Sequence, residues 1–139
     1  MIDRRRLDSK REEDAALREI AMLTSLRSYY PTTNRLSQVL QVTEDAHHFH
    51  IVMEFVEGGS LASVLLQHQE QSLDERGVQQ IARELLKAVD QLHDLNIGHF
   101  GLQPENILLK TNHQHQEVVL CDFASSMYMD EKRRTHVGN

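Results

Sequence analysis

Residues 10–27 carry apolar side chains at helical spacing, which predicts an amphipathic helix. Proline cannot continue a helix, so Pro31 places the end of this helix a few residues earlier. Glu19 borders the apolar face, where a carboxylate is most often a residue at the solvent edge. The residues on that face are Ala16, Ile20, Leu23 and Leu26.

After this helix the apolar residues alternate with polar ones instead of following helical spacing. This alternation predicts two strands, at 38–43 and 49–55. In the second segment Phe49, Ile51, Met53 and Phe55 alternate with more polar residues, as in a strand with one buried face. The tetrapeptide 43–46 between the segments is a credible hairpin turn. Gly58-Gly59 then interrupts the pattern, and a short helix is expected from Leu61 to about Gln67.

The clearest helix is expected over 74–95. Ser72 and Glu75 have the spacing of a capping box, in which the serine hydroxyl accepts from the Glu75 amide and the glutamate returns to the serine amide. The helix ends near Asn96. Its broad apolar stripe consists of Val78, Ile81, Ala82, Leu85, Ala88, Val89 and Leu92.

Two short apolar strands are expected after this helix, at 107–109 and 118–121, with the polar stretch 111–116 as a hairpin loop. The tail over 125–139 is polar, and we expect it to be mobile. The alternation of helices and short strands without repeats predicts an α+β fold.

Composition narrows the function classes. A chain of 139 residues has the size of one domain. A formal net charge of −6 argues against nucleic acid or an anionic membrane as the main partner. The single cysteine, Cys121, fits a reducing compartment, and no apolar run reaches the ~18 residues of a membrane span. We therefore expect a cytoplasmic protein. The basic cluster Arg4-Arg5-Arg6 with Lys10-Arg11 leaves a nuclear address open, although a solvated basic turn is the simpler interpretation.

Residues 99–109, His-Phe-Gly-Leu-Gln-Pro-Glu-Asn-Ile-Leu-Leu, are the most informative segment. Asp122-Phe123-Ala124 follows it at a short distance. This pair of motifs resembles the catalytic loop H-R-D-L-x-P-E-N and the D-F-G turn of protein kinases. Two substitutions damage the chemistry. The position of the catalytic aspartate holds Gly101, and the position of the usual lysine two residues later holds Gln103.

The resemblance implies a partial protein kinase-like α+β fold that covers nearly all of this chain but about half of the family's domain. It implies an N-lobe portion with hinge over 1–59, the start of the C-lobe over 60–124, and an activation-segment-like tail over 125–139. Glu19 then falls at the ion-pairing glutamate of the family's regulatory helix. More specifically, the chain resembles the DAP kinase family and its apoptosis-associated relatives.

Site residues follow from the same resemblance. Met53 matches the gatekeeper position, and Glu54 and Val56 match the backbone groups that meet adenine. Glu105 and Leu108 match the floor of the adenine site. Asn106 and Asp122 match both metal-binding positions, where an amide and a carboxylate suit Mg²⁺. Residues Leu23, His99 and Phe123 match an apolar column that joins the two lobes, so His99 is interpreted as structural.

Other departures weaken the expected activity. No G-x-G-x-x-G pattern precedes Glu19, and the third-strand lysine of the family would fall at or just before Met1. Phe100 replaces the arginine that would meet a phosphorylated activation segment. We expect Mg²⁺ and ATP to bind weakly or not at all, and the function to be that of a catalytically impaired pseudokinase that binds or scaffolds in intracellular signalling. The alternative is part of an active serine/threonine kinase whose other segments lie outside this chain.

The wide stripe of helix 74–95 would face a helical lobe in the family, so a protein partner is expected on that face. Histidine clusters raise a further alternative. His47-His48-x-His50 and His113-x-His115 invite a zinc interpretation, but each lies in a polar turn or strand edge. The sequence shows no cysteine or third ligand at suitable spacing, so it does not favour zinc.

Overall fold

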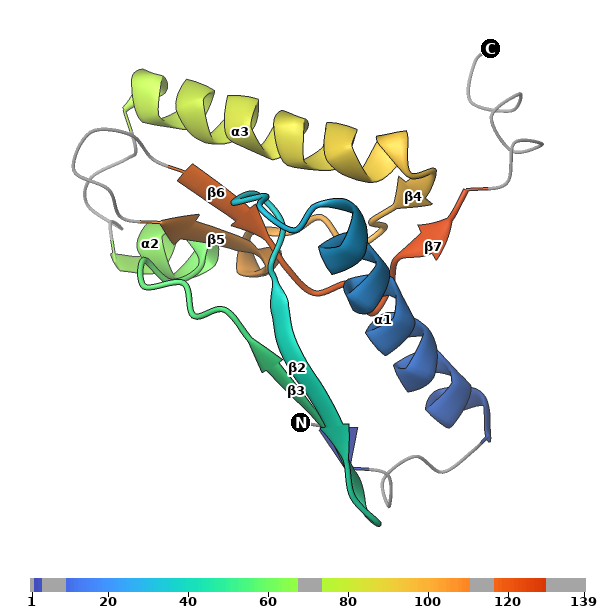
Figure 1. Cartoon of the computed structure of the whole chain (residues 1–139). Helices are drawn as coiled ribbons and strands as arrows, with labels where there is room; N and C mark the ends of the chain where they lie inside the picture. Colours follow the sequence, from blue (N-terminus) through green and yellow to red (C-terminus); the bar gives the residue numbers. More distant parts are fainter. Residues whose placement is uncertain (1, 4–9, 68–73, 111–116, 130–139) are drawn as a thin grey trace.

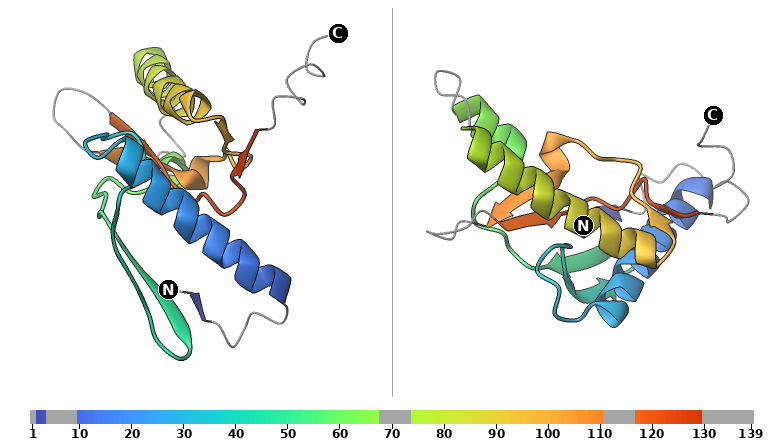
Figure 2. Two further views of the ribbon diagram at one scale, coloured as in Figure 1. Left: turned by 45° about the vertical axis from the view of Figure 1, so that its right-hand side comes forward. Right: turned by 90° about the horizontal axis from the view of Figure 1, so that it is seen from above.

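The computed structural model describes residues 2–3, 10–67, 74–110 and 117–129. Figure 1 shows a long β-ribbon beside helix α1 on one side and helix α3 over a short hairpin on the other. The side and top views of Figure 2 show that α1 and α3 run in different directions rather than as a parallel pair. The described part is thus an α+β arrangement of small antiparallel sheets and separate helices, as the sequence pattern predicts.

Helix α1 spans Lys10–Tyr29 and so confirms the predicted first helix. Its end is marked by the Tyr30 amide, which donates to the Leu26 carbonyl at 2.9 Å, just before Pro31. Arg27 near that end donates through Nη1 to the Leu40 carbonyl at 2.6 Å and fixes the helix to the neighbouring ribbon. The face that packs into the protein consists of Ala16, Met22, Leu23 and Leu26.

The ribbon is the antiparallel pair β2, Val39–Glu44, and β3, His48–Met53. The short strand β1, Ile2–Asp3, joins the other edge of β3 and gives the order β1-β3-β2. The turn lies later than predicted, because residues 43 and 44 still pair with β3. The prediction for Phe55 was wrong: the chain leaves the strand after Met53, and the Phe55 side chain is 83% exposed.

Helix α2, Leu61–Gln67, and helix α3, Glu75–Asp94, confirm the two predicted later helices. The prediction that Ser72 caps the N-terminus of α3 was wrong. Asp74 is the N-cap of α3, since its Oδ1 accepts from the Gly77 amide at 2.9 Å; Ser72 lies outside the described residues. At the other end Leu95 is the C-cap, and Asn96, the next residue, takes a left-handed conformation with φ 56°, as is common just after a helix end.

After α3 come the short strand β4, Ile97–Gly98, and a 3₁₀ turn, η2, at Pro104–Asn106. The hairpin β5, Ile107–Lys110, with β6, Glu117–Leu120, confirms the two predicted strands. The loop between them, 111–116, lies outside the described residues. A last strand, β7, Met127–Tyr128, pairs with β4. This pairing corrects the interpretation of 125–129 as part of a mobile tail.

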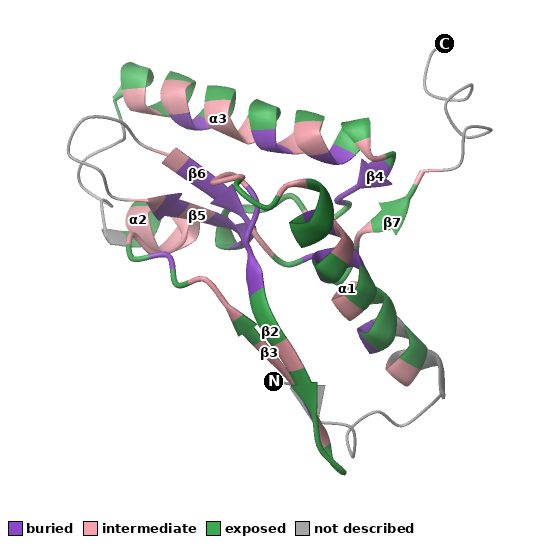
Figure 3. Ribbon diagram, in the orientation of Figure 1, coloured by how far each residue is buried: buried purple, intermediate pink, exposed green. Residues whose placement is uncertain are grey.

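One core joins both parts of the chain. Figure 3 shows the buried positions concentrated on β5, β6 and the side of α3 that faces them. Leu36, Val118, Leu120 and Phe123 are at most 1% exposed. Leu85 and Val89 of α3 pack against this core. The predicted apolar stripe is therefore only partly uncovered: its one exposed large member is Val78, at 50%. Leu86, which lies outside the predicted stripe, is 69% exposed.

Polar contacts connect the loop that follows α1 to helix α3. Arg35 donates from Nε to Glu84 Oε2 of α3 at 3.0 Å, and Lys87 reaches the other oxygen of Glu84 at 2.6 Å. These two hydrogen-bonded cations lower the pKa of Glu84, with Lys87 as the larger cause. Among the described helices, none has the length and apolar character that crossing a membrane requires.

Candidate functional site

The loop that follows β4 is organised around His99. The Gly101 amide donates to His99 Nδ1 at 3.2 Å, so Nδ1 acts as the acceptor. The other ring nitrogen, Nε2, then carries the hydrogen and donates to the Cys121 carbonyl at 3.1 Å. Burial lowers the pKa of His99, while the Cys121 carbonyl and Asp122 oppose that shift. The ring is a neutral structural link between the loop and the residues before Asp122.

Asn106 closes the same loop from its other end. Its amide nitrogen donates to the Gly101 carbonyl at 2.9 Å, and the residue is buried. A carbonyl can only accept, so the NH₂ group must face Gly101 and the amide oxygen points elsewhere. The Asn106 carbonyl accepts the Cys121 amide at 3.0 Å, which places Asn106 beside the residue that precedes Asp122.

The turn Asp122-Phe123-Ala124 separates a polar from an apolar side chain. Asp122 adopts φ 63° and is exposed, and its Oδ1 accepts from the Ala124 amide at 3.2 Å. Phe123 is 1% exposed, and its ring meets the His99 ring with centroids 5.3 Å apart. Leu23 is likewise buried in the core, so the three residues of the predicted apolar column are all interior.

The arrangement suits Mg²⁺ in its donor types. The amide oxygen of Asn106 and the carboxylate of Asp122 are hard oxygen ligands of the kind that this ion prefers. The register that pairs Ile107 with Leu120 brings the chain segments of the two residues together. Gly101, by contrast, contributes only backbone atoms.

Glu19 lies on α1, half-buried, on the same side as Asp122. Desolvation raises the pKa of Glu19, and the negative charge of Asp122 raises it further. The positive charge of the amino terminus opposes both effects and lowers the pKa, and among the described residues no side-chain cation is paired with the Glu19 carboxylate. Glu19 also lines a hollow between α1 and the segment after the turn, together with Arg18, Met22, Phe100, Ser126 and Tyr128.

The residues assigned to adenine lie at and just after the end of β3, where the chain leaves the ribbon and runs beside β5. The Glu54 amide donates to the Gln38 carbonyl at 2.9 Å, and the Glu54 carboxylate pairs with Lys110 of β5 at 3.0 Å. Met53 is half-buried at the end of β3, and Val56 is 8% exposed. The Leu109 amide donates to the Gly59 carbonyl at 2.9 Å, so the hinge segment runs beside β5.

The two residues assigned to the adenine floor differ in exposure. Leu108 is half-buried in β5 and bridges to Ser60, whereas Glu105 is exposed on the η2 turn. The hinge and β5 therefore lie side by side. Their roles toward a nucleotide stay predictions.

Two features were missed at the sequence level. The first is the return of the chain onto the loop through β7, where Ser126 Oγ donates to the His99 carbonyl at 3.2 Å. A strand of two residues leaves no periodic signal. The second is Asp45, which approaches His48 and His50 across the β2–β3 turn. The spacing Asp-x-x-His-x-His across a hairpin is the signal that would have found it.

Comparison with known proteins gives a consistent result. The family model for the protein kinase domain matches residues 1–138. Calcium/calmodulin-dependent protein kinase type 1 of Macrobrachium nipponense is 30% identical over 130 residues, which cover 94% of this chain and 35% of that protein. Serine/threonine-protein kinase dkf-2 of Caenorhabditis briggsae is 34% identical over 129 residues, covering 91% of this chain and 10% of that protein.

Human serine/threonine-protein kinase D2 is 34% identical over 140 residues, which cover 99% of this chain and 15% of that protein. The chain thus spans about a third or less of the length of these relatives. The family model covers almost every residue, and it agrees with the catalytic-loop and D-F-G-like motifs and with the α+β fold. The chain therefore belongs to the protein kinase family.

Proposed function

We propose that this chain is a catalytically impaired member of the kinase family that acts by binding rather than by phosphoryl transfer. The observation that carries the proposal is Gly101. Both backbone groups of Gly101 are hydrogen-bonded: its amide donates to His99, and its carbonyl accepts from Asn106. At the position where active relatives present the aspartate that accepts the substrate proton, this loop has no side chain.

Neighbouring substitutions support the same proposal. Gln103 carries no charge with which to stabilise a transferring phosphoryl group, and it precedes the η2 turn as an exposed residue. Phe100 is 64% exposed at φ 54°, and its ring lies where a Cβ on Gly98 would stand. An apolar ring at this position offers no partner to a phosphate.

Kinases use ATP and Mg²⁺, and residues for both are present in part. Asn106 and Asp122 would hold the metal ion, whose charge neutralises the phosphates during transfer. Glu54 and Val56 would meet adenine through backbone groups. In active kinases an ion pair with a glutamate at the position of Glu19 holds the phosphate-binding lysine, and among the described residues no lysine is paired with Glu19. We expect weak nucleotide binding.

The binding role is assigned to α3. Val78, Ala82 and Leu86 are exposed along this helix, and apolar side chains gathered on one surface are typical of contact with another protein. A protein partner on this surface is therefore proposed. Placement near the DAP kinases is also proposed. It rests on the degenerate catalytic loop together with the sequence Leu120-Cys121-Asp122-Phe123.

A loop exchange tests the proposal independently of chain length. Residues 99–106 of this chain replace the matching segment of a full-length active serine/threonine kinase. Loss of a positioned base costs ~10²–10⁴ in rate, and loss of one charge-stabilising donor costs ~10²–10³. Such losses are not strictly additive, but even the smaller values together give about 10⁴.

The matched control restores the two residues within the exchanged segment. A Cβ added to Gly101 would meet its nearest neighbours, His99 and Asn106, at 3.5 Å or more, so Gly101→Asp fits at Cβ. Gly101→Asp with Gln103→Lys should return most of the activity. An exchanged kinase that keeps more than about 1% of its rate would overturn the proposal, because a lost base alone removes ~10²-fold.

The second test measures phosphoryl transfer by the chain itself. Incubated with radiolabelled ATP, Mg²⁺ and a basic peptide, it should transfer no more phosphate than a heat-killed sample. Active kinases turn over at about 1–100 s⁻¹. Sustained transfer above ~0.1 s⁻¹ that disappears in Asp122→Asn would make this chain an enzyme with a rewired site.

A further inference from the structure

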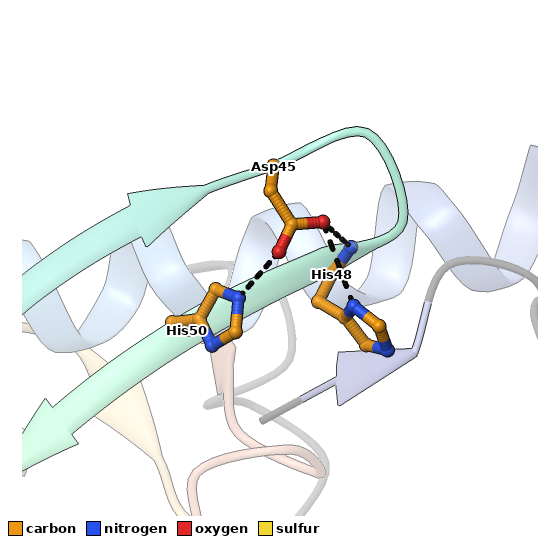
Figure 4. Close-up of side chains that lie close together, drawn as sticks. All are labelled: Asp45, His48 and His50. Atoms are coloured by element: carbon orange, nitrogen blue, oxygen red, sulfur yellow. Dashed lines mark hydrogen bonds and ion pairs between the residues drawn. The ribbon is translucent and has the colours of Figure 1, made fainter.

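Three side chains with metal-binding atoms converge at the tip of the β-ribbon, away from the kinase-like loop. His48 and His50 are two residues apart on β3, so they project from the same face of the strand. Asp45 stands in the turn. Its Oδ2 lies 2.8 Å from His50 Nε2, and its Oδ1 lies 3.5 Å from His48 Nδ1. Figure 4 shows the carboxylate between the two imidazoles, with one oxygen toward each.

The turn holds the carboxylate in this position. The backbone amides of His47 and His48 both donate to Asp45 Oδ1, at 2.7 and 2.9 Å, and the Asp45 amide donates to the His48 carbonyl at 2.9 Å. The hydrogen bond from His50, followed by that from the His47 amide, lowers the pKa of Asp45. Backbone hydrogen bonds of this kind orient ligating carboxylates in metal sites.

The distances fit one ion. The three potential ligand atoms lie within 4.8 Å of one another. Two ligands of a tetrahedral zinc ion, each bound at about 2.0–2.1 Å, are about 3.4 Å apart. The separations of 2.8 Å, between His50 Nε2 and Asp45 Oδ2, and 3.5 Å, between His48 Nδ1 and Asp45 Oδ1, bracket that value, each through a different oxygen of the carboxylate. Small side-chain rotations would therefore replace the hydrogen bond between Asp45 and His50 by coordination to a shared ion.

The chemistry selects the class of ion. Two imidazoles and one carboxylate form a ligand set of open zinc sites, in which water completes the coordination. Imidazole nitrogen favours Zn²⁺, Cu²⁺ and Ni²⁺ over Mg²⁺ and Ca²⁺. The Asp45, His48 and His50 side chains are 51%, 20% and 39% exposed, so the site is reached from solvent.

We propose that Asp45, His48 and His50 form a binding site for one divalent transition-metal ion of the zinc class. The ion fastens the β2–β3 turn to the face of β3. The simpler alternative is that the three residues form only the hydrogen bonds of the turn, which an exposed cluster of this size makes without a metal. The metal site predicts that one ion binds per chain, whereas hydrogen bonds alone predict no stoichiometric metal binding.

The test is calorimetric titration of the metal-stripped, untagged chain with Zn²⁺. All proteins carry His113→Gln and His115→Gln, which removes the other His-x-His pair of the sequence. We expect one ion per chain, and affinity at least ~10-fold lower in each of Asp45→Asn, His48→Gln and His50→Gln, a loss on the scale seen when even outer-shell partners of a metal are removed. His93→Gln, an exposed histidine on α3, should bind as the parent does.

A second measurement keeps the proposal testable if one of these variants folds poorly. Zn²⁺ should raise the melting temperature of the parent through binding to the folded state, and this rise should vanish in Asp45→Asn. Asparagine keeps an oxygen that accepts the two turn amides, so this variant removes the ligand charge while retaining the turn. Binding weaker than roughly 100 µM, or stoichiometric binding that is unchanged in His50→Gln, would overturn the proposal.

Discussion

His99 and Phe123 form an edge-on ring pair with centroids 5.3 Å apart, and this pair joins the catalytic-loop segment to the D-F-G-like turn. Both residues are buried, at 4% and 1% exposure. The ring contact involves no side chain at position 101 or 103, and Gly101 holds His99 only through its backbone amide. The loop therefore keeps its framework although its catalytic side chains are replaced.

His99 should make the stability of the protein depend on pH. Its pKa is lowered in the fold, mainly by burial, with Asp122 and the Cys121 carbonyl as the opposing neighbours. Below the ordinary histidine pKa of about 6.5, the unfolded chain takes up a proton that the folded chain resists. The free energy of unfolding should thus be highest above pH 6.5 and fall as the pH drops toward the folded pKa.

Chemical denaturation of the parent and His99→Gln between pH 7.5 and 5.5 checks this. The variant should be less stable at pH 7.5 and should show a shallower pH dependence. His93→Gln, exposed on α3, is the control and should keep the slope of the parent. Equal slopes in all three proteins would contradict the assignment.

Glu19→Gln should stabilise the chain at neutral pH. Desolvation and the charge of Asp122 raise the pKa of Glu19, so the folded state binds a proton more readily than the unfolded state. The penalty on the ionised side chain is present at pH 7 and fades as the pH falls through the folded pKa toward 4.5. Thermal melts should show a higher melting temperature for Glu19→Gln at pH 7 and a smaller difference near pH 4.5. The control Asp14→Asn removes an exposed carboxylate from the same helix and should not reproduce this gain.

Adjacent leucines on α3 separate packing from surface binding. Leu85 packs against the core, whereas Leu86 is 69% exposed. Leu85→Gln should lower the free energy of unfolding by about 2 kcal/mol or more, because a polar amide enters an apolar contact and packing is lost. Leu86→Gln should change stability by less than ~0.5 kcal/mol and reduce hydrophobic-dye binding and self-association. Unchanged dye binding in Leu86→Gln would show that the exposed surface around Leu86 is not the one that binds the dye.

Asp74→Ala should destabilise α3 by about 1 kcal/mol, since the Gly77 amide loses its acceptor. Urea denaturation measures the difference. Asp90→Ala, at an exposed interior position of the same helix, is the matched control and should have a much smaller effect. Similar losses in both variants would indicate a charge effect rather than loss of the cap.

Calorimetry with Mg-ATP should reveal no affinity tighter than the high-micromolar range. Each missing charge-assisted phosphate contact removes roughly 1.5–3 kcal/mol, and among the described residues no lysine is paired with Glu19. A low-micromolar dissociation constant that is abolished by Asp122→Ala would contradict this prediction. Glu57→Ala, an exposed carboxylate near the hinge, serves as the control.

Long periodic segments could be predicted from the sequence. The apolar faces of α1 and α3 are set by residues such as Leu23 and Leu92, whose spacing is a local property. Ends were less predictable. The cap of α3 was assigned to Ser72 rather than Asp74 because both residue types suit an N-cap, and the choice depends on where the chain enters the helix.

The site was predictable only as far as its motifs are contiguous. Asn106 and the turn at Asp122 were identified from their sequence context, and the structure places their segments side by side. The pairing of Met127 with Gly98 and the approach of Asp45 to His50 depend on tertiary folding or on the turn geometry. Two-residue strands and polar turns carry too little periodicity to reveal such contacts.

The β2–β3 ribbon enters and leaves the rest of the protein at one place. Its two connections, at Gln38 and Glu54, are held to each other by the 2.9 Å hydrogen bond between the Glu54 amide and the Gln38 carbonyl. Just before Gln38, the Ser37 amide donates to the Leu120 carbonyl at 2.9 Å and anchors the chain on β6. Further along, Arg27 of α1 holds β2 at the Leu40 carbonyl, and β1 pairs with β3 at His48 and Phe49. The ribbon is therefore tied to its surroundings at its base and again along both of its strands, and the Asp45 turn is supported from either side.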